Sequence, residues 1–437
     1  MSYFIARITA LALYVTLVTL NASRVWAGGA YLYENGGPSL GTAQAGQAAL
    51  AQDASTVVDN PAGMTRLERS QSMSSMYAIL MSTQFKRGPD TTFSGGNGFN
   101  AGTSIPSSSS ASLPFPAGSF SYVYSLSPDF KLGAGLVSAY GGGLNYGKTW
   151  AGRYNVQKLQ ILSATLNPGF AYRLNHWLSV GAGFSVNYAL FSQTAAINNV
   201  LDRLPDGRYK FKADDWGFGG NAGVLIEPNS QLRFGLAYRS PIDFSYSDRI
   251  RFTNVGPGLR RILEQVGVLG GETTMEQTNP QTVMGNWYYA ITKEFAVMGG
   301  FGWQNWKQYG DVGVRVDSST TKQNVDINAH FRDTWHEAIG FQYRLARRWL
   351  LSTGFAHDSS AVSKFHRTPN APFDEQFRYG MGLQYDWSKD ITIGAAYGFL
   401  NLGNAEIANL QRLGGTLQGD YPKNKVYFIA LNVVWKF

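Results

Sequence analysis

The sequence contains no cysteine, few charged residues and, after its first 27 residues, no long apolar run. Asp, Glu, Lys and Arg make up 15% of its 437 residues, which is low for a soluble protein. Without cysteine the chain has neither a disulfide framework nor a thiolate metal site. The histidines at 176, 330, 336, 357 and 366 are scattered, and none has the spacing of a metalloprotease helix. We therefore expect no metal site and no cofactor.

Two further absences bear on the function. Basic residues are in mild excess, with a formal net charge of +8, but they form no Lys/Arg block that would indicate nucleic-acid binding. The chain has no G-x-S-x-G nucleophile elbow, and the loose dinucleotide-like pattern at 217–222 lies in a strand-like stretch. The sequence therefore favours a protein that is not an enzyme.

The first 27 residues have the pattern of a secretory signal peptide. Arg7 precedes an apolar core at 8–20, and the segment ends on the small residue Ala27. Because this core is short for a membrane-spanning helix, we expect cleavage after Ala27 rather than a membrane anchor. No later apolar run is long enough for a transmembrane helix, so a membrane-spanning mature chain must be a closed β-barrel.

Most of the mature chain alternates with a period of two. In 178–190 one face carries Leu, Val, Phe and Tyr, and the other carries Ser, Gly and Asn; the segment 391–399 has the same pattern. A soluble sandwich would carry more Lys, Glu and Asp on its second face. A small, weakly polar second face is expected when one side of the strand faces lipid and the other faces a lumen.

The alternating segments number fourteen, and short connections between them alternate with long ones. We expect strands near 71–85, 117–126, 130–140, 158–173, 177–191, 214–227, 231–247, 280–293, 295–308, 329–345, 348–358, 373–387, 390–401 and 423–437. The long connections lie near 86–116, 141–157, 192–213, 248–279, 309–328, 359–372 and 402–422. This pattern predicts an all-β fold, a fourteen-stranded antiparallel transmembrane barrel over 67–437 with both termini on the periplasmic side.

The last strand ends on an aromatic residue, Phe437, in the correct phase of its alternation. A terminal Phe in this position resembles the signal that the barrel-assembly machinery reads. We therefore expect that machinery to be a partner of the chain.

Residues 28–66 do not alternate and predict an N-terminal plug. A fourteen-stranded barrel is too wide for its own side chains to fill, and this segment is rich in Ala, Gly, Ser and Thr, as expected of short, compactly packed helices. The turn Asn60-Pro61-Ala62 marks the end of this mainly helical hatch. Pro61 fixes the backbone direction there, and Asn60 can form a hydrogen bond to the wall.

Two long connections, near 195–205 and 257–269, contain apolar residues at helical spacing. The second run follows Pro257 and precedes a Gly-Gly pair. Two interpretations stay open: the two helices cover the barrel mouth, or they form an apolar groove that captures a substrate. The groove candidates are Ile197, Val200, Leu201, Leu204, Leu259, Ile262, Leu263 and Val266.

These features together resemble the FadL family of Gram-negative outer-membrane transporters for hydrophobic compounds. The stretch "ENGGPSLGTAQAGQAALAQDASTVVDNPAGM" is similar to the hatch of that family, and "GFAYRLNHWLSVGAGFSVNYA", "FRDTWHEAIGFQYRL" and the final "VVWKF" also resemble it. The resemblance implies an outer-membrane barrel with a plug that takes up hydrophobic molecules passively.

The resemblance also implies a route for the substrate. Capture occurs between the third and fourth extracellular loops, which hold the two amphipathic runs here, and transfer to an internal pocket beside the plug follows. The substrate then leaves sideways into the membrane beside an inward-kinked third strand, which suits an apolar solute. The glycines that permit a kink in or after 130–140 are Gly133, Gly135, Gly141, Gly142 and Gly143.

One departure from the family concerns the basic residues that hold a fatty-acid carboxylate. The corresponding stretches, 190–196 and 325–330, contain no Lys or Arg. Arg239 and Arg332 are candidate replacements, unless both pair with acids such as Asp243 or Asp333 and the substrate is neutral.

We therefore predict a monomeric channel for hydrophobic compounds. Long-chain fatty acids are the first expected substrate, and neutral hydrocarbons or monoaromatics taking the same route are the second. A barrel without transport, such as an adhesin or a membrane hydrolase, is the alternative from a different class.

Overall fold

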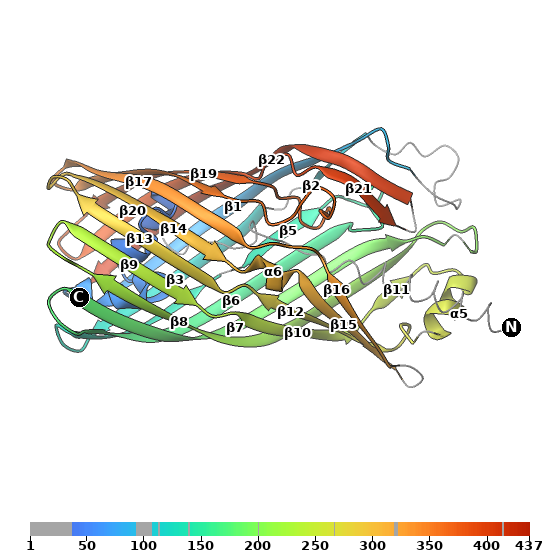
Figure 1. Cartoon of the computed structure of the whole chain (residues 1–437), viewed down its shortest axis with the longest axis horizontal. Helices are drawn as coiled ribbons and strands as arrows, with labels where there is room; N and C mark the ends of the chain where they lie inside the picture. Colours follow the sequence, from blue (N-terminus) through green and yellow to red (C-terminus); the bar gives the residue numbers. More distant parts are fainter. Residues whose placement is uncertain are drawn as a thin grey trace.

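Fourteen antiparallel strands close into a barrel (Figure 1), as the alternation predicted. The computed structural model describes residues 37–92, 107–111, 114–138, 140–199, 201–265, 267–318, 322–412 and 415–437; the expected signal peptide and residues 28–36 lie outside these ranges. The wall strands are β1 (Gln71–Arg87), β3 (Pro114–Ser125), β4 (Phe130–Val137), β6 (Lys158–Arg173), β7 (Leu178–Ile197), β8 (Gly207–Ile226), β9 (Leu232–Arg239), β13 (Thr282–Ala290), β14 (Phe295–Gln304), β17 (Thr334–Ala346), β18 (Trp349–Asp358), β19 (Gln376–Asp386), β20 (Ile391–Asn401) and β22 (Gly415–Lys436).

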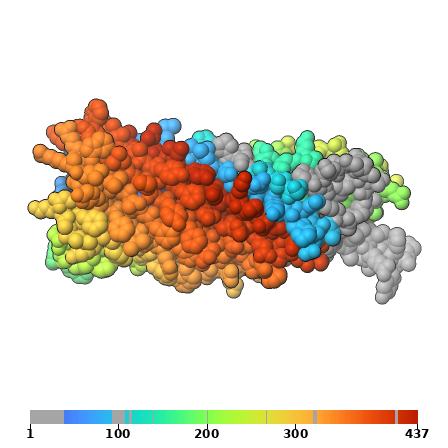
Figure 2. Space-filling view, turned by 90° about the horizontal axis from the view of Figure 1, so that it is seen from above, coloured from blue at the N-terminus to red at the C-terminus, as the bar shows by residue number. Residues whose placement is uncertain are grey.

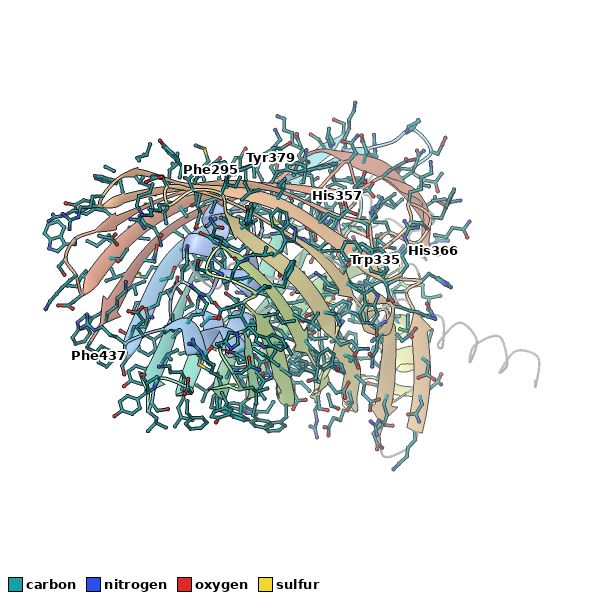
Figure 3. All side chains as sticks on the ribbon, turned by 60° about the vertical axis from the view of Figure 1, so that its left-hand side comes forward. Phe295, Trp335, His357, His366, Tyr379 and Phe437 are labelled. Atoms are coloured by element: carbon teal, nitrogen blue, oxygen red, sulfur yellow. The ribbon has the colours of Figure 1, made fainter. Side chains whose placement is uncertain are left out.

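The first and last wall strands close the barrel. β1 pairs with β22 from Gln71 opposite Lys436 to Arg87 opposite Gly419, and Figure 2 shows the blue surface of β1 beside the red surface of β22. The Phe437 N–H donates to the Ser70 carbonyl at 2.9 Å, so the end of the chain is tied to the start of the wall. Phe437 and His366 lie at opposite ends of the barrel (Figure 3), and the C-terminus lies at the end with the short turns.

The outer surface carries an apolar band of membrane thickness. On β8 the outward residues are apolar or Gly from Trp216 to Ile226, close to the roughly 9–11 residues with which a tilted strand crosses the hydrocarbon core. Aromatic pairs lie on this surface at different heights, with the Phe301 and Trp335 rings 5.1 Å apart and the Phe295 and Tyr343 rings 6.4 Å apart. This band is the part of the barrel that lies in a membrane.

Above the band the wall continues as further strands. The prediction that the long connections are loops was therefore wrong. The long connections expected to be loops contain β2 (Ser108–Ala111), β5 (Gly141–Asn145), β11 (Arg251–Thr253), β12 (Glu272–Asn279), β15 (Asp311–Asp317), β16 (Lys322–Asn328) and β21 (Ile407–Arg412). The single strand expected at 231–247 is divided into β9 and β10 (Ile242–Arg249). β10, β12, β15 and β16 form a separate sheet with Phe244 and Val314 buried on one face and Glu276 and Arg315 exposed on the other. Because their outer face meets water instead of lipid, these strands lack the apolar alternation on which the prediction relied.

The predicted plug fills the lumen near the short-turn end. It consists of α2 (Gly37–Gly41), α3 (Gln47–Leu50), α4 (Thr56–Asp59) and the 3-10 helix η2 (Pro61–Arg66), drawn in blue in Figure 1. The side chains from Ser39 to Thr65 are buried, except for the half-buried Gln52. Among the helices in the described part of the chain, none is long and apolar enough to span a membrane.

Glycines on the inner face of the wall allow the plug backbone to lie directly against it. A Cβ at Gly354 would lie 1.9 Å from the Thr42 carbonyl oxygen, and one at Gly235 would lie 2.0 Å from the Ala48 carbonyl oxygen. No side chain fits at such distances, so these positions require Gly because of close approach rather than backbone conformation. The small second face of the strands is thus the surface on which the plug packs.

We expect Gly235→Val to unseat α3 and to open a leak through a barrel that still assembles. The new side chain would collide with the Ala48 carbonyl, which cannot move without the plug. Conductance in planar bilayers measures the leak, and heat-modifiable electrophoretic mobility reports assembly. Gly285→Val in β13 is the matched control, because its Cβ would approach nothing closer than 3.8 Å. Equal conductance in the two variants would contradict the packing argument.

Candidate functional site

The turn Asn60-Pro61-Ala62 ties two parts of the plug to the wall. The Asn60 Oδ1 accepts from the Ala62 N–H at 3.1 Å, and its Nδ2 donates to the carbonyls of Ala48 at 2.7 Å and Val224 at 3.0 Å. Pro61 begins η2, where its missing N–H costs no hydrogen bond. The hydrogen bond from Asn60 to the wall is therefore present, on β8.

The short helix α4, next to this turn, is held from two sides. On one side its Val57 lies against β4, where a Cβ at Gly133 would lie 3.0 Å from the Val57 Cγ2. On the other side the Arg239 guanidinium donates to the Val58 carbonyl at 2.9 Å, and the Asn221 amide donates to the same carbonyl at 3.3 Å. The helix therefore bridges the third wall strand to β8 and β9.

The third wall strand is broken between β4 and β5. Val137 pairs with Thr165 and Gly141 with Leu162, so four steps along this strand oppose three steps along β6, as in a β-bulge. The ladder between β3 and β4 ends at Phe120 opposite Leu136. In the described part of the chain, β5 forms a ladder with β6 and none with β3. Within the described residues, the third strand above the break is therefore hydrogen-bonded to the wall on one side.

The candidate kink glycines lie on both sides of this break. Gly133 and Gly135 lie within β4, in regular pairing with both neighbouring strands, and face the plug. Gly141, Gly142 and Gly143 begin β5 after the break.

At the break itself, hydrogen bonds of serine hydroxyls replace the backbone hydrogen bonds of the ladder. The Ser138 Oγ donates to the Ser163 carbonyl at 2.8 Å, and the Tyr140 N–H donates to the Ser163 Oγ at 2.9 Å. Sequence reasoning missed Ser163, because nothing in the pattern distinguishes it from the other serines of β6 and β7.

The break and the plug share one buried apolar cluster. Val137, the last residue of β4, packs in the same cluster as Val57, Val58 and Met64 of the plug and Ala171 of β6. A displacement of α4 would therefore remove the packing beneath the break.

Of the two predicted loop helices, the second is present, and the described residues of the first segment form no helix. α5 (Pro257–Gln265) buries Leu259 and Leu263 and half-buries Ile262, while Val266 lies outside the described residues.

The helix expected near 195–205 is wrong. β7 continues to the buried Ile197, residues 201–203 form a turn, and Val200 lies outside the described residues. Leu201 and Leu204 are 52% and 42% exposed. The helical spacing of these apolar residues is a coincidence. It combines Ile197, an inward residue at the end of β7, with leucines of the turn that follows.

The two loop segments nevertheless meet, through polar groups. The Asp202 carboxylate accepts from the N–H groups of Gly258 at 2.7 Å and Leu259 at 3.2 Å, and so caps the N-terminus of α5. The Asn199 Oδ1 accepts from the Gly256 N–H at 3.0 Å, and its Nδ2 donates to the Asn254 carbonyl at 2.8 Å. Sequence reasoning missed both residues, because the cap comes from a different loop from the helix it stabilises.

Apolar side chains line the interior from the extracellular loops to the plug. Leu259 and Leu263 of α5 belong to the same buried cluster as Leu40 of the plug. Other members of the cluster are Tyr140, Phe191, Tyr246, Trp306 and Phe428.

The buried Tyr146 contributes an uncharged polar group to this interior and connects several loops and strands. The Tyr146 ring stacks on Trp150 with centroids 4.0 Å apart, and its hydroxyl bonds to the Tyr421 hydroxyl at 2.9 Å and to the Pro369 carbonyl at 3.0 Å. Burial, with the neighbouring Tyr421 as a smaller cause, raises the pKa of Tyr146 well above its ordinary value. The hydroxyl therefore stays uncharged at neutral pH.

The two candidate carboxylate partners are bound to protein groups. Arg239 lies 3.7 Å from the Asp59 carboxylate in addition to its bond to Val58, and the Arg332 Nε donates to the Ser360 carbonyl at 3.0 Å. The acids named as their partners are occupied elsewhere: Asp243 accepts from the Thr278 hydroxyl, and Asp333 accepts from the Trp303 indole and the Asn305 amide. Pairing with Asp243 or Asp333 was therefore wrong, because the plug and the following loop supply closer acceptors.

A buried charged network that sequence reasoning missed lies in the upper wall. His336 Nδ1 is 2.9 Å from Asp358 Oδ1, and the Arg378 Nε donates to Asp358 Oδ2 at 3.0 Å. The three residues come from three adjacent strands, β17, β18 and β19, so only the fold reveals that they meet. Within the described residues no group of three His, Cys, Asp or Glu side chains is arranged to hold a metal ion.

A closed fourteen-stranded barrel with an apolar outer band, a lumen plug and an apolar interior is the architecture of an outer-membrane transporter of hydrophobic compounds. The chain belongs to the family described as outer membrane protein transport protein (OMPP1/FadL/TodX), whose sequence model matches residues 18–437.

Curated relatives match along most of their length. The long-chain fatty acid transport protein of Escherichia coli O6:H1 is 28% identical over 417 residues, which cover 89% of this chain and 90% of that protein. Outer membrane protein P1 of Haemophilus influenzae is 24% identical over 439 residues, covering 92% of each.

Solved structures share the fold. A Pseudomonas aeruginosa FadL homologue superimposes with a TM-score of 0.83 at 18% identity and covers 93% of this chain and 99% of its own. The toluene transporter TodX of Pseudomonas putida superimposes with a TM-score of 0.68 at 14% identity, covering 91% and 97%.

We expect Asn60→Ala to loosen the plug without unfolding the barrel. The variant loses one buried hydrogen bond, one partly buried hydrogen bond and a helix cap, which together stabilise the seated plug by about 2–4 kcal/mol. Amide hydrogen exchange should rise over 56–66 and stay unchanged in β14 and β17. A uniform rise over the whole barrel, or no rise at all, would show that Asn60 does not hold the plug specifically.

Proposed function

We propose that this chain takes up long-chain fatty acids passively across the outer membrane and releases them sideways through the wall above the break between β4 and β5. The observation that carries the proposal is that this break lies on the same apolar cluster as α4 of the plug. Release sideways into lipid suits an apolar solute, because the solute passes from an apolar interior into lipid without entering water.

The extracellular loops support capture as the first step. Leu201 and Leu204 expose apolar surface on the loop that caps α5, and the buried face of α5 continues into the apolar interior. Exposed leucines on a loop above the membrane are costly unless an apolar partner covers them. The groove between the third and fourth loops is thus our candidate entry, and the interior cluster is the path to the plug.

Fatty acids are the first candidate substrate because the curated relatives named above include a long-chain fatty acid transport protein. Neutral aromatics or hydrocarbons are the second, and a specific observation favours them. Residues 190–196 and 325–330 contain no Lys or Arg, and Arg239 and Arg332 already bind protein groups. A neutral substrate needs no basic partner.

Two further expectations from the sequence stay proposals. We propose that the chain works as a monomer and that the barrel-assembly machinery recognises its last residue. The Phe437 ring is 42% exposed and stacks on Tyr122 with centroids 5.9 Å apart, at the seam between the two ends of the wall.

We expect a disulfide between α4 and β4 to stop uptake. In the double variant Val57→Cys/Gly133→Cys, the position of a Cβ at 133 lies 3.0 Å from the Val57 Cγ2, a distance suited to a disulfide. The chain has no native cysteine that could compete. Uptake of labelled oleate and of a labelled neutral aromatic by cells carrying the variant should fall at least tenfold on oxidation and recover with reductant. Both single variants are controls.

Two results would contradict the proposal in different ways. Full uptake with the disulfide formed would show that α4 need not move. Unchanged uptake of both substrates after deletion of the gene would show that the chain is not a transporter of either.

We expect Arg239→Gln to separate the two substrate classes. When α4 moves, Arg239 loses the Val58 carbonyl and Asp59, and its guanidinium becomes available to a carboxylate. Uptake of oleate should then fall about tenfold in the variant while uptake of a neutral aromatic stays within twofold. Arg332→Gln is the matched comparison from the extracellular side. Equal losses for both substrates would assign Arg239 to plug seating alone.

A further inference from the structure

An outward row of basic side chains crosses adjacent strands just above the lipid-facing band. The ladders place Lys158 of β6 opposite Thr194 of β7, Thr194 opposite Lys210 of β8, and Lys210 opposite Arg251 of β11. Arg208 and Lys212 flank Lys210 on the same face of β8, opposite Ala196 and Ser192. We call Lys158, Arg208, Lys210, Lys212 and Arg251 the basic row.

The basic row is exposed and has no acidic partner in the described part of the chain. All five side chains are exposed, and none takes part in an ion pair with a described residue. Two nearby acids are engaged elsewhere, since Asp206 pairs with Arg153 at 2.6 Å and Asp202 caps α5. Asp214, the next outward residue below Lys212, forms no ion pair with a described residue.

The height of the basic row identifies the level of the membrane that it meets. Trp216 and Phe218, the outward residues below Asp214, are 58% and 60% exposed and lie in the lipid-facing band. Lys212 is four residues above Trp216, which in a strand tilted by about 40° is about 10 Å along the membrane normal. That is the level of the headgroups of the extracellular leaflet.

We propose that the basic row binds the phosphate groups of lipopolysaccharide, the phosphorylated glycolipid of the extracellular leaflet. Five unpaired cations on a flat sheet face match a headgroup that carries several phosphates, and the aromatic surface directly below them contacts its acyl chains. The hydroxyls of Ser192 and Thr194, which lie between the cations, are further donors to phosphate oxygens. The row flanks the loop that Asp202 connects to α5, so the bound lipid borders the proposed entry. The inference depends on the outer-membrane location and not on the transport proposal.

The test compares two triple variants of the full-length protein purified in detergent. Arg208→Gln/Lys210→Gln/Lys212→Gln removes the centre of the basic row. Arg347→Gln/Arg348→Gln/Lys389→Gln is the matched control, since these three exposed basic residues of the short turns also form no ion pair with a described residue. Binding of bisphosphorylated lipid A is measured by native mass spectrometry, with fully dephosphorylated lipid A and phosphatidylglycerol as comparison lipids.

We expect the basic-row variant to bind bisphosphorylated lipid A at least about tenfold more weakly than the unmodified protein, and the control to bind within twofold. Dephosphorylated lipid A should show no difference between the variants. Equal binding by both triple variants, or equal loss in both, would overturn the proposal. Equally strong, row-dependent binding of phosphatidylglycerol would overturn the assignment to lipopolysaccharide. If the triple variant fails to assemble, Lys210→Gln alone should still weaken binding about threefold.

Discussion

The backbone of the plug lies directly against the backbone of the wall, and the rest of the structure depends on this contact. Carbonyl oxygens of Thr42 and Ala48 occupy the space where side chains of Gly354 and Gly235 would be. A wide barrel can be sealed in this way by a short segment of small residues, without the bulky core that a soluble domain needs. The same contact explains why glycine is frequent on the inner face of the wall strands.

Within this contact α4 takes hydrogen-bond donors for its carbonyls from the wall. A helix of four residues cannot satisfy its own terminal carbonyls. The wall supplies the donors, because Asn221 and Arg239 both donate to the Val58 carbonyl. On its other face Val57 and Val58 meet β4, beside Met64 of η2. Moving α4 exchanges two or three hydrogen bonds, whereas moving α2 or α3 would withdraw backbone from closely fitted glycine surfaces. This difference is the reason why we propose an opening at the side of the broken strand.

The sequence predicted the features that the membrane imposes on the strands. It did not predict the strands that face water or the contacts between residues distant in sequence. All fourteen wall strands were predicted because lipid forces large apolar residues to one face, and α5 was predicted because its spacing and its Pro257 agree. The strands β12, β15 and β16 were missed because their outer face is polar, and 195–205 was misassigned because Leu201 and Leu204 fit a helical spacing by coincidence. The bond from Asn60 to the wall was predictable from an amide beside a rigid turn. The partners of Arg239, the cap at Asp202 and the role of Ser163 depend on residues distant in sequence, which no local pattern identifies.

The bulge between β4 and β5 constrains how this strand can change over evolutionary time. Because the side chains of a strand alternate, the extra residue sets which of them face inward above the break, and it places Leu144 in the interior with none of its surface exposed. Removing or adding one residue there would turn Leu144 and its neighbours to the opposite face of the wall. Relatives can therefore diverge at this strand by exchanging one residue type for another, but hardly by insertion or deletion of a single residue, and its length should drift far less than that of the loops that surround it.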